Sequence, residues 1–162
     1  MTNDYTTTFE VQTSADAVFA AITRPREWWS ANIRGRTGLA GDVFFYDKGQ
    51  IHNATIEVLE STPRVVTWRV LKNHFGFTAD SSEWTGTTIV FELAPTSSGT
   101  VLTFTHRGLN PAEECFPICE VAWTFYVQHS LRALIESASG SPDADPVPDP
   151  APIDSPGKQP SD

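Results

Sequence analysis

Between residues 42 and 108 the chain alternates apolar and polar side chains in successive short segments, and this period of two constrains the fold more than any other feature. The segments are 42–47, 50–60, 64–72, 87–94 and 100–108. Short turns rich in Gly, Pro and Ser separate most of them, which favours antiparallel neighbours. Because each segment has one apolar and one polar face, we expect a sheet with one face in water and the other covered.

A further strand and two short helices are expected before this run. Residues 5–12 also alternate, so they predict a strand. Ser14 is a suitable N-cap and Asp16 lies in the first turn that follows, which predicts that a helix begins there. The string PREWW, which starts at Pro25, predicts a second short helix that carries two adjacent tryptophans.

A long helix is expected to cover the sheet. From Pro111 onwards apolar residues recur at intervals of three and four, and Pro117 predicts a kink or a restart. No other predicted element is long enough to span the apolar face. The sequence therefore predicts an α+β fold in which a curved antiparallel sheet, two short helices and one long C-terminal helix enclose a cavity, and such gaps are common ligand sites.

The composition changes at Ser139. The last 24 residues hold seven of the 12 prolines and five Asp against one Lys, and Val147 and Ile153 are their only large aliphatic side chains. Such a segment buries too little apolar surface to offset the entropy of ordering it. We therefore expect one domain at 1–138 and a disordered Pro- and Asp-rich tail at 139–162.

The charge balance excludes two classes of partner. Lys and Arg number 11 against 20 Asp and Glu, a net charge of −9, so neither nucleic acid nor an anionic membrane surface is an expected partner. No apolar run approaches the roughly 20 residues of a membrane span. The first residues lack the basic start and apolar stretch of a signal peptide. A cytoplasmic location is the expectation that follows.

Several strings resemble one known superfamily. FEVQTSADAVFAAITRPREWWS, EWTGTTIVFEL, FTHRGL and ECFPICEVAWTFYVQHSLRALI resemble the START-like superfamily (SRPBCC, or Bet v 1-like), in its branch related to the ATPase activator of the ninety-kilodalton heat-shock chaperone. The resemblance covers nearly all of residues 5–138. It implies a helix-grip fold with an internal, mostly apolar cavity. Members bind lipids, hormones or polyketides, and some are cyclases, hydrolases or co-chaperones, so the fold alone selects no activity.

Aromatic side chains dominate the walls that such a cavity would have, which suits a flat or cyclic apolar ligand. Phe77 and Trp84 lie in a loop that could close over it. The alternative for each aromatic residue is a place in the packed core. The candidate ligand-binding residues are His52, Ile56, Trp68, Val70, Phe77, Trp84, Phe91, Phe104, His106, Cys119, Trp123 and Tyr126.

The histidines and cysteines leave alternatives open. His52 and His106 on apolar faces are either core histidines with satisfied hydrogen bonds, proton donors or acceptors at a ligand, or metal ligands. Cys115 and Cys119, one helical turn apart, are either small buried residues or half of a zinc site. Neither a CxxC pair nor an HExxH motif is present, so we predict no metal and no cofactor.

Three functions are compatible with these observations. The favoured one is binding of a small hydrophobic or aromatic molecule in the cavity. The second is a polyketide cyclase-like or hydrolase-like enzyme with His52 or His106 as general base. The third is a co-chaperone-like protein-interaction module. Because the GxSxG, P-loop and GxGxxG motifs are missing, the sequence does not decide whether the chain catalyses a reaction, and it names neither the ligand nor the oligomeric state.

Overall fold

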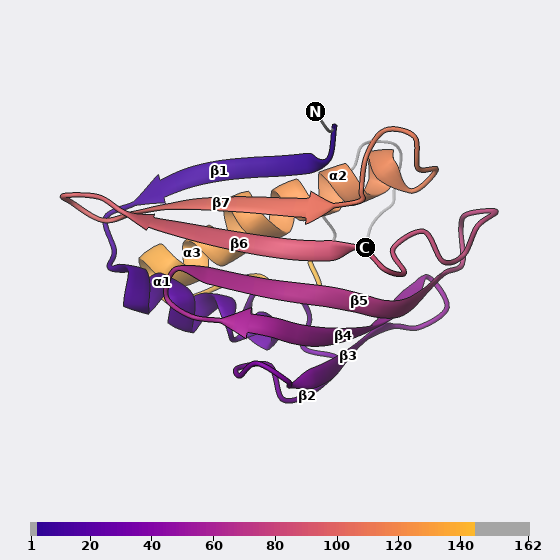
Figure 1. Cartoon of the computed structure of the whole chain (residues 1–162), viewed down its shortest axis with the longest axis horizontal. Helices are drawn as coiled ribbons and strands as arrows, with labels where there is room; N and C mark the ends of the chain where they lie inside the picture. Colours follow the sequence, from indigo (N-terminus) through magenta and orange to yellow (C-terminus); the bar gives the residue numbers. More distant parts are fainter. Residues whose placement is uncertain (1–2, 145–162) are drawn as a thin grey trace, which may run out of the picture.

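The computed structural model describes residues 3–144, in which a curved antiparallel sheet lies against a long C-terminal helix (Figure 1). The sheet has seven strands in the order β1-β7-β6-β5-β4-β3-β2. The strands are β1 (Tyr5–Val11), β2 (Ile33–Gly35), β3 (Val43–Lys48), β4 (His52–Ser61), β5 (Val65–Phe75), β6 (Thr88–Pro95) and β7 (Thr100–Arg107). This architecture confirms the predicted α+β helix-grip fold.

The short helices follow the predicted order. Helix α1 (Ala15–Ile22) begins where expected, because the Ser14 side chain accepts a hydrogen bond from the backbone N–H of Ala17. The second helix is only a single 3₁₀ turn, η1 (Pro25–Glu27), and the two tryptophans that follow it are buried. Strand β2 was not predicted, because its three residues lie inside a Gly-rich stretch that reads as a turn.

Strand β5 is longer than its alternation predicts, because a β-bulge interrupts the pairing with β4. Ile56 pairs with Val70, whereas Thr55 pairs with Lys72, so Leu71 is the extra residue. A bulge reverses which face the following side chains occupy. Phe75 is therefore buried, although the unbroken alternation of β5 would place it on the opposite face to Val70. The strand carries Phe75 to the end of the sheet where the candidate site lies.

The C-terminal helix begins at Phe116 rather than at Pro111, and Pro117 lies in its first turn, where the missing N–H costs nothing. The Glu83 carboxylate caps this end by accepting from the backbone N–H groups of Glu114 and Cys115, each at 2.9 Å. The helix runs as α2 (Phe116–Thr124), a π-helical segment η2 (Phe125–Leu131) and α3 (Arg132–Ser137). π-Helical turns are rare and occur frequently at functional sites.

All five tryptophans meet in the interior between sheet and helix. Trp29 is central, with ring centroids 5.1 Å from Trp123, 6.1 Å from Trp68, 6.4 Å from Trp28 and 6.5 Å from Trp84. Their bulk fills the middle of the space that the curved sheet and the helix enclose. Within the described residues, these rings occupy much of the space where an internal cavity is expected, and a pocket opens at one end of the sheet.

The segment after the last helix is bound to the domain as far as the structure describes it. Asp143 accepts hydrogen bonds from the Ser30 hydroxyl and the Ala31 N–H, and its own N–H donates to the carbonyl of Trp29. Ser130 joins the same region, because its hydroxyl donates to the Trp28 carbonyl at 2.7 Å. These hydrogen bonds connect residues 139–144 to the body of the domain, and the boundary at 138 stays a prediction. The rest of the predicted tail, 145–162, lies outside the described residues.

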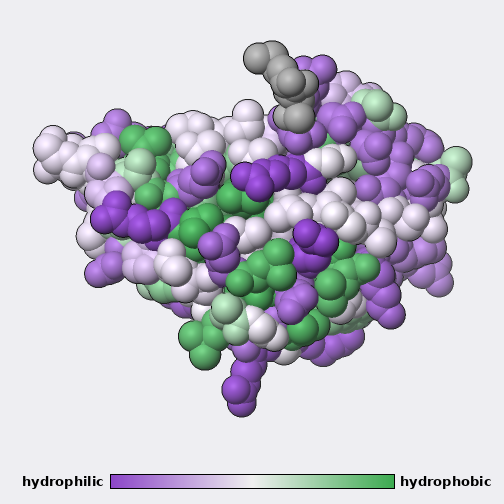
Figure 2. Space-filling model, viewed as in Figure 1, coloured by the Kyte–Doolittle hydropathy of each residue, from purple (hydrophilic) through white to green (hydrophobic). Residues whose placement is uncertain are grey.

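The convex face of the sheet is a mosaic of polar and apolar side chains (Figure 2). Hydrophobic residues gather over β3, β4 and β5, where Val43, Leu59 and Leu71 are exposed. Leu59 and Leu71 both lie at register shifts between β4 and β5. The polar face predicted for the sheet is thus interrupted where the bulges turn apolar side chains outward.

Candidate functional site

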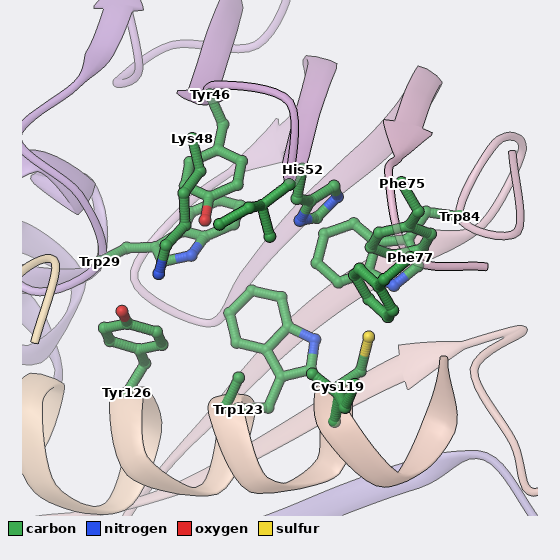
Figure 3. A pocket seen from close by; sticks show the side chains of 13 residues that line it. Trp29, Tyr46, Lys48, His52, Phe75, Phe77, Trp84, Cys119, Trp123 and Tyr126 are labelled. Atoms are coloured by element: carbon green, nitrogen blue, oxygen red, sulfur yellow. The ribbon is translucent and has the colours of Figure 1, made fainter. Parts of the chain in front are cut away.

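An apolar pocket opens at the end of the sheet where the β3–β4 turn, the β5–β6 loop and helix α2 meet (Figure 3). Its volume is about 180 Å³. Pockets for drug-sized ligands have roughly 300–1,000 Å³, and a cavity of about 150 Å³ holds benzene, so this pocket suits one or two fused rings. Its walls are Trp29, Tyr46, Lys48, Ile51, His52, Phe75, Phe77, Trp84, Ile118, Cys119, Ala122, Trp123 and Tyr126.

One wall is a row of side chains across three neighbouring strands. Lys48 of β3 pairs with His52 of β4, and His52 pairs with Phe75 of β5. Directly opposed residues in antiparallel strands point to the same face, so these three side chains share the inner face. Tyr46, two residues before Lys48, lies on that face as well.

Two stacked aromatic pairs form the other walls. Trp29 stacks on Tyr46 with ring centroids 4.4 Å apart and the planes at 16°. Trp84 from the β5–β6 loop stacks on Trp123 of α2 at 5.6 Å and 7°. Trp29 also contacts Trp123 and thereby links the two pairs. The arrangement offers flat ring faces and edges, which are the surfaces that bind another aromatic ring.

The mouth of the pocket has an apolar rim. Ile51 is 58% exposed, Ile118 54% and Phe77 36%. They come from the β3–β4 turn, helix α2 and the β5–β6 loop, so three separate segments contribute one apolar side chain each. We call Ile51, Phe77 and Ile118 the apolar rim. A cluster of this kind around a concave opening is typical of binding sites.

His52 is the titratable group in the pocket wall. Its ring contacts Phe75, Trp84 and Tyr46, with centroids 4.2, 4.4 and 5.2 Å away. Burial lowers the pKa of His52 to about 3, and the positive charge of Lys48 contributes to that shift. The imidazole is therefore neutral at pH 7. Its Nε2 atom is buried and has no hydrogen-bond partner among the described residues.

His106 lies behind the pocket wall, and both of its ring nitrogens are engaged. Trp123 Nε1 donates to His106 Nδ1 at 3.0 Å, so the proton of the neutral ring lies on Nε2. Nε2 donates to the Thr87 hydroxyl at 2.8 Å, and this hydroxyl donates to the carbonyl of Trp84 at 2.6 Å. Burial lowers the pKa of His106 to about 3. This chain of hydrogen bonds fixes Trp84 and Trp123, the stacked pair of the pocket.

The candidate ligand-binding residues divide into two groups in the structure. Six of them line the pocket, namely His52, Phe77, Trp84, Cys119, Trp123 and Tyr126. The other six, Ile56, Trp68, Val70, Phe91, Phe104 and His106, have no exposed surface and pack in the core behind it. Alternation predicts that a residue lies on the inner face of the sheet. It does not predict whether that residue lines the pocket or packs against the tryptophans that fill the rest of the interior.

Sequence reasoning missed several wall residues, among them Trp29, Tyr46 and Lys48. A usable signal was present for two of them. Phe44, Tyr46 and Lys48 alternate along β3, and the first two are buried, so Lys48 belongs to the inner face although it is charged. Trp29 follows a 3₁₀ turn, where no simple period indicates the direction of a side chain.

The structure places the two cysteines differently. Cys119 lines the pocket, whereas Cys115 is fully buried behind it. The contact with Cys119, together with burial and the nearby Glu83 carboxylate, raises the pKa of the Cys115 thiol, so this sulfur stays protonated. No group of three or more His, Cys, Asp or Glu side chains within residues 3–144 is placed to hold a metal ion.

The sequence shows no apolar run of membrane-spanning length, and the helices of the structure can be compared with that observation. In the described part of the chain, no helix combines the length and the apolar composition that a membrane crossing requires.

Comparison with solved structures shows the same fold in several other proteins. The Aha1 dimer from Colwellia psychrerythraea matches with a TM-score of 0.66 and 21% identity, over 86% of this chain and 100% of that one. Protein MLL2253 from Mesorhizobium loti matches with a TM-score of 0.63 and 18% identity, over 82% of this chain and 97% of that one. DynU16, a protein of the dynemicin biosynthetic locus, matches with a TM-score of 0.64 and 17% identity, over 86% of this chain and 49% of that one.

The family assignment rests on the sequence. No curated protein matches the chain significantly. The profile of one family, described as activator of Hsp90 ATPase homolog 1-like protein, matches residues 12–136. This span includes most of the sheet and nearly all of the C-terminal helix, the elements that build the pocket. The chain therefore belongs to the activator of Hsp90 ATPase homolog 1-like family within the START-like superfamily.

Proposed function

We propose that this protein binds a small, planar aromatic molecule in the pocket between the β3–β4 turn, the β5–β6 loop and helix α2. The observation that carries the proposal is the combination of stacked aromatic walls with an exposed apolar rim. Apolar area left in water costs about 25 cal/mol per Å² relative to burial, so a bound ring that covers the rim and the walls gains free energy. A planar molecule can also contact the parts of the aromatic walls that the stacked pairs leave open.

The hydrogen bonds that fix the pocket walls support the proposal, because they indicate that the site is formed before a ligand binds. His106 holds Trp123 and, through Thr87, the backbone at Trp84. The carboxylate of Glu83 fixes the same loop to the start of the C-terminal helix. Because these groups are ordered before the ligand arrives, binding does not have to offset the entropy of arranging them.

One structural neighbour supports this proposal. DynU16 is described as a protein in the dynemicin biosynthetic locus, and it shares the fold. A catalytic role finds less support in the pocket. His106 has no free nitrogen, and His52 with a pKa of about 3 is a weak base. A protein-interaction role stays a prediction from the sequence.

The proposal is tested by calorimetric titration with 2-naphthamide, an uncharged two-ring compound. We expect a dissociation constant of about 0.1 mM or tighter, the affinity usual for a compound of this size. Ala122 is a small residue of the pocket wall, so Ala122→Phe fills the pocket while every larger wall side chain stays in place, and it should weaken binding at least about tenfold.

A matched variant controls for unspecific effects of the added ring. Ala133 lies in a polar groove lined by Gln128 and Glu136, away from the aromatic pocket. Ala133→Phe should leave the affinity unchanged. If both variants bind 2-naphthamide as the wild type does, or if the wild type does not bind it at all, the pocket is not the binding site that we propose.

A further inference from the structure

Of the described residues that line the pocket, Lys48 is the one with a charged side chain. It ends strand β3, and its pairing with His52 places it on the inner face of the sheet. Figure 3 shows its side chain running beside Tyr46, with the ammonium group on the side of Trp29 and Tyr126. The positive charge therefore lies at the edge of an otherwise apolar and uncharged pocket.

This charge is not neutralised within the described part of the chain. Arg24, Arg34 and Arg132 each form an ion pair with a carboxylate, whereas Lys48 forms none there. Among the described residues, no Asp or Glu is part of the pocket walls. Other described cations, such as Arg69 and Lys72, also lack an ion pair, so what distinguishes Lys48 is its place beside an apolar pocket. Lys48 is itself exposed, so the apolar walls strengthen its attraction for an anion only on the side that faces the pocket.

A hydrogen-bond donor lies beside this lysine. The Tyr46 hydroxyl points into the pocket (Figure 3) and has no hydrogen-bond partner among the described residues, although the side chain is only 5% exposed. Burial raises the pKa of Tyr46, with a smaller contribution from the negative charge of Asp143, so the hydroxyl keeps its proton. Tyr46 and Lys48 thus present an O–H donor and an ammonium group from alternate positions of one strand.

We propose that the ligand is an aromatic acid, whose rings lie between the aromatic walls and whose carboxylate is bound by Lys48 and the Tyr46 hydroxyl. This inference rests on the proposed function and names the chemical class of the ligand. The ring supplies contact area, and the ion pair and hydrogen bond orient it. Lys48 and Tyr46 then determine specificity, because they distinguish an acid from a neutral compound of equal shape.

The test compares two isosteric compounds on the full-length protein by isothermal titration calorimetry at pH 7.5. These are 2-naphthoate and 2-naphthamide, which differ in charge but hardly in shape. We expect the acid to bind about tenfold more tightly than the amide, the range of a partly exposed ion pair with a charge-assisted hydrogen bond. The difference should shrink as salt is raised from 50 to 500 mM.

Variants separate the charge from the packing of the lysine side chain. Lys48→Met keeps a stem of similar length and should lower the affinity for 2-naphthoate to that for 2-naphthamide, while the amide binds as before. Lys48→Arg should keep the preference, and Tyr46→Phe should reduce it about threefold. Lys72→Met, at an exposed position of β5 outside the pocket, is the matched control and should change neither affinity.

Two results would overturn this inference. One is equal binding of acid and amide to the wild type, and the other is an equal loss of both ligands in Lys48→Met, which would assign the lysine to packing alone. In each case the amide still binds to the wild type, so the proposed function survives. Absence of binding for both compounds would contradict the proposed function as well.

Discussion

At the residue scale, the two buried histidines show how similar pKa values can accompany different roles. His106 uses both ring nitrogens inside the protein, which makes it a structural link between Thr87 and Trp123. His52 lies in the pocket wall with its Nε2 unpaired among the described residues. Both are neutral at pH 7, because burial lowers the pKa of each to about 3.

Their burial predicts a dependence of stability on pH. An unfolded histidine has a pKa near 6.5, so the unfolded state binds more protons than the folded state between about pH 6.5 and pH 3. Stability is therefore fully present above pH 6.5 and falls as the pH is lowered. Between pH 7.0 and 5.5 each histidine should contribute a loss of about 1 kcal/mol in the free energy of unfolding.

Urea unfolding at the two pH values measures this loss. His52→Phe removes one titrating ring without breaking a hydrogen bond, so it should lower the loss by about 1 kcal/mol. His74→Phe replaces an exposed histidine of β5 and serves as the control. If the wild type and His52→Phe show the same pH dependence, His52 is not held neutral in the folded protein.

Sequence reasoning placed both histidines on the inner face, and the structure places both there. It could not distinguish their roles, because the period of two specifies a face and not a neighbour. The helix that carries Trp123 and the loop that carries Trp84 are distant in sequence from both histidines. Their packing decides whether a ring nitrogen contacts another side chain or faces the pocket.

At the element scale, the segment after the last helix contributes to the domain. Residues 139–144 pass over the chain at Trp28–Ala31, where Asp143 accepts two hydrogen bonds. Tyr126 of the pocket wall donates from its hydroxyl to the carbonyl of Ala144 at 2.9 Å. The segment therefore helps to hold Trp29 and Tyr126, which form neighbouring parts of the pocket.

Asp143→Asn tests this contribution. Asn tolerates the left-handed backbone at this position, where φ is 61°, but it has one acceptor oxygen where Asp has two. We expect a loss of about 1 kcal/mol in the free energy of unfolding, measured by urea titration. Asp4→Asn is the control and should change stability by less than about 0.5 kcal/mol. Equal stabilities of the two variants would show that the segment adds nothing to the domain.

The elements themselves were largely predictable, and the exceptions have physical causes. Six of the seven strands and the order of the helices follow from alternation and capping. Strand β2 was missed because three residues among glycines carry no period. The extension of β5 to Phe75 was missed because the bulge at Leu71 breaks the alternation.

At the scale of the whole molecule, the tryptophans determine where a ligand can bind. A curved sheet and a single helix leave space between them, and in this protein Trp28, Trp29 and Trp68 occupy its middle. The space that remains lies at the end of the sheet, between Trp84, Trp123 and the apolar rim. Composition indicates an aromatic interior, but the position of the pocket depends on how these rings pack against one another.

The location of a bound ring is the most direct test of the account. In the NMR spectra of the complex with 2-naphthamide, the naphthalene protons should show intermolecular nuclear Overhauser effects to the indole of Trp123 and to the methyl groups of Ile51 and Ile118. Contacts to these residues would place the ligand inside the rim and against the helix. Contacts confined to the convex face of the sheet, or to the groove at Gln128 and Glu136, would contradict the account.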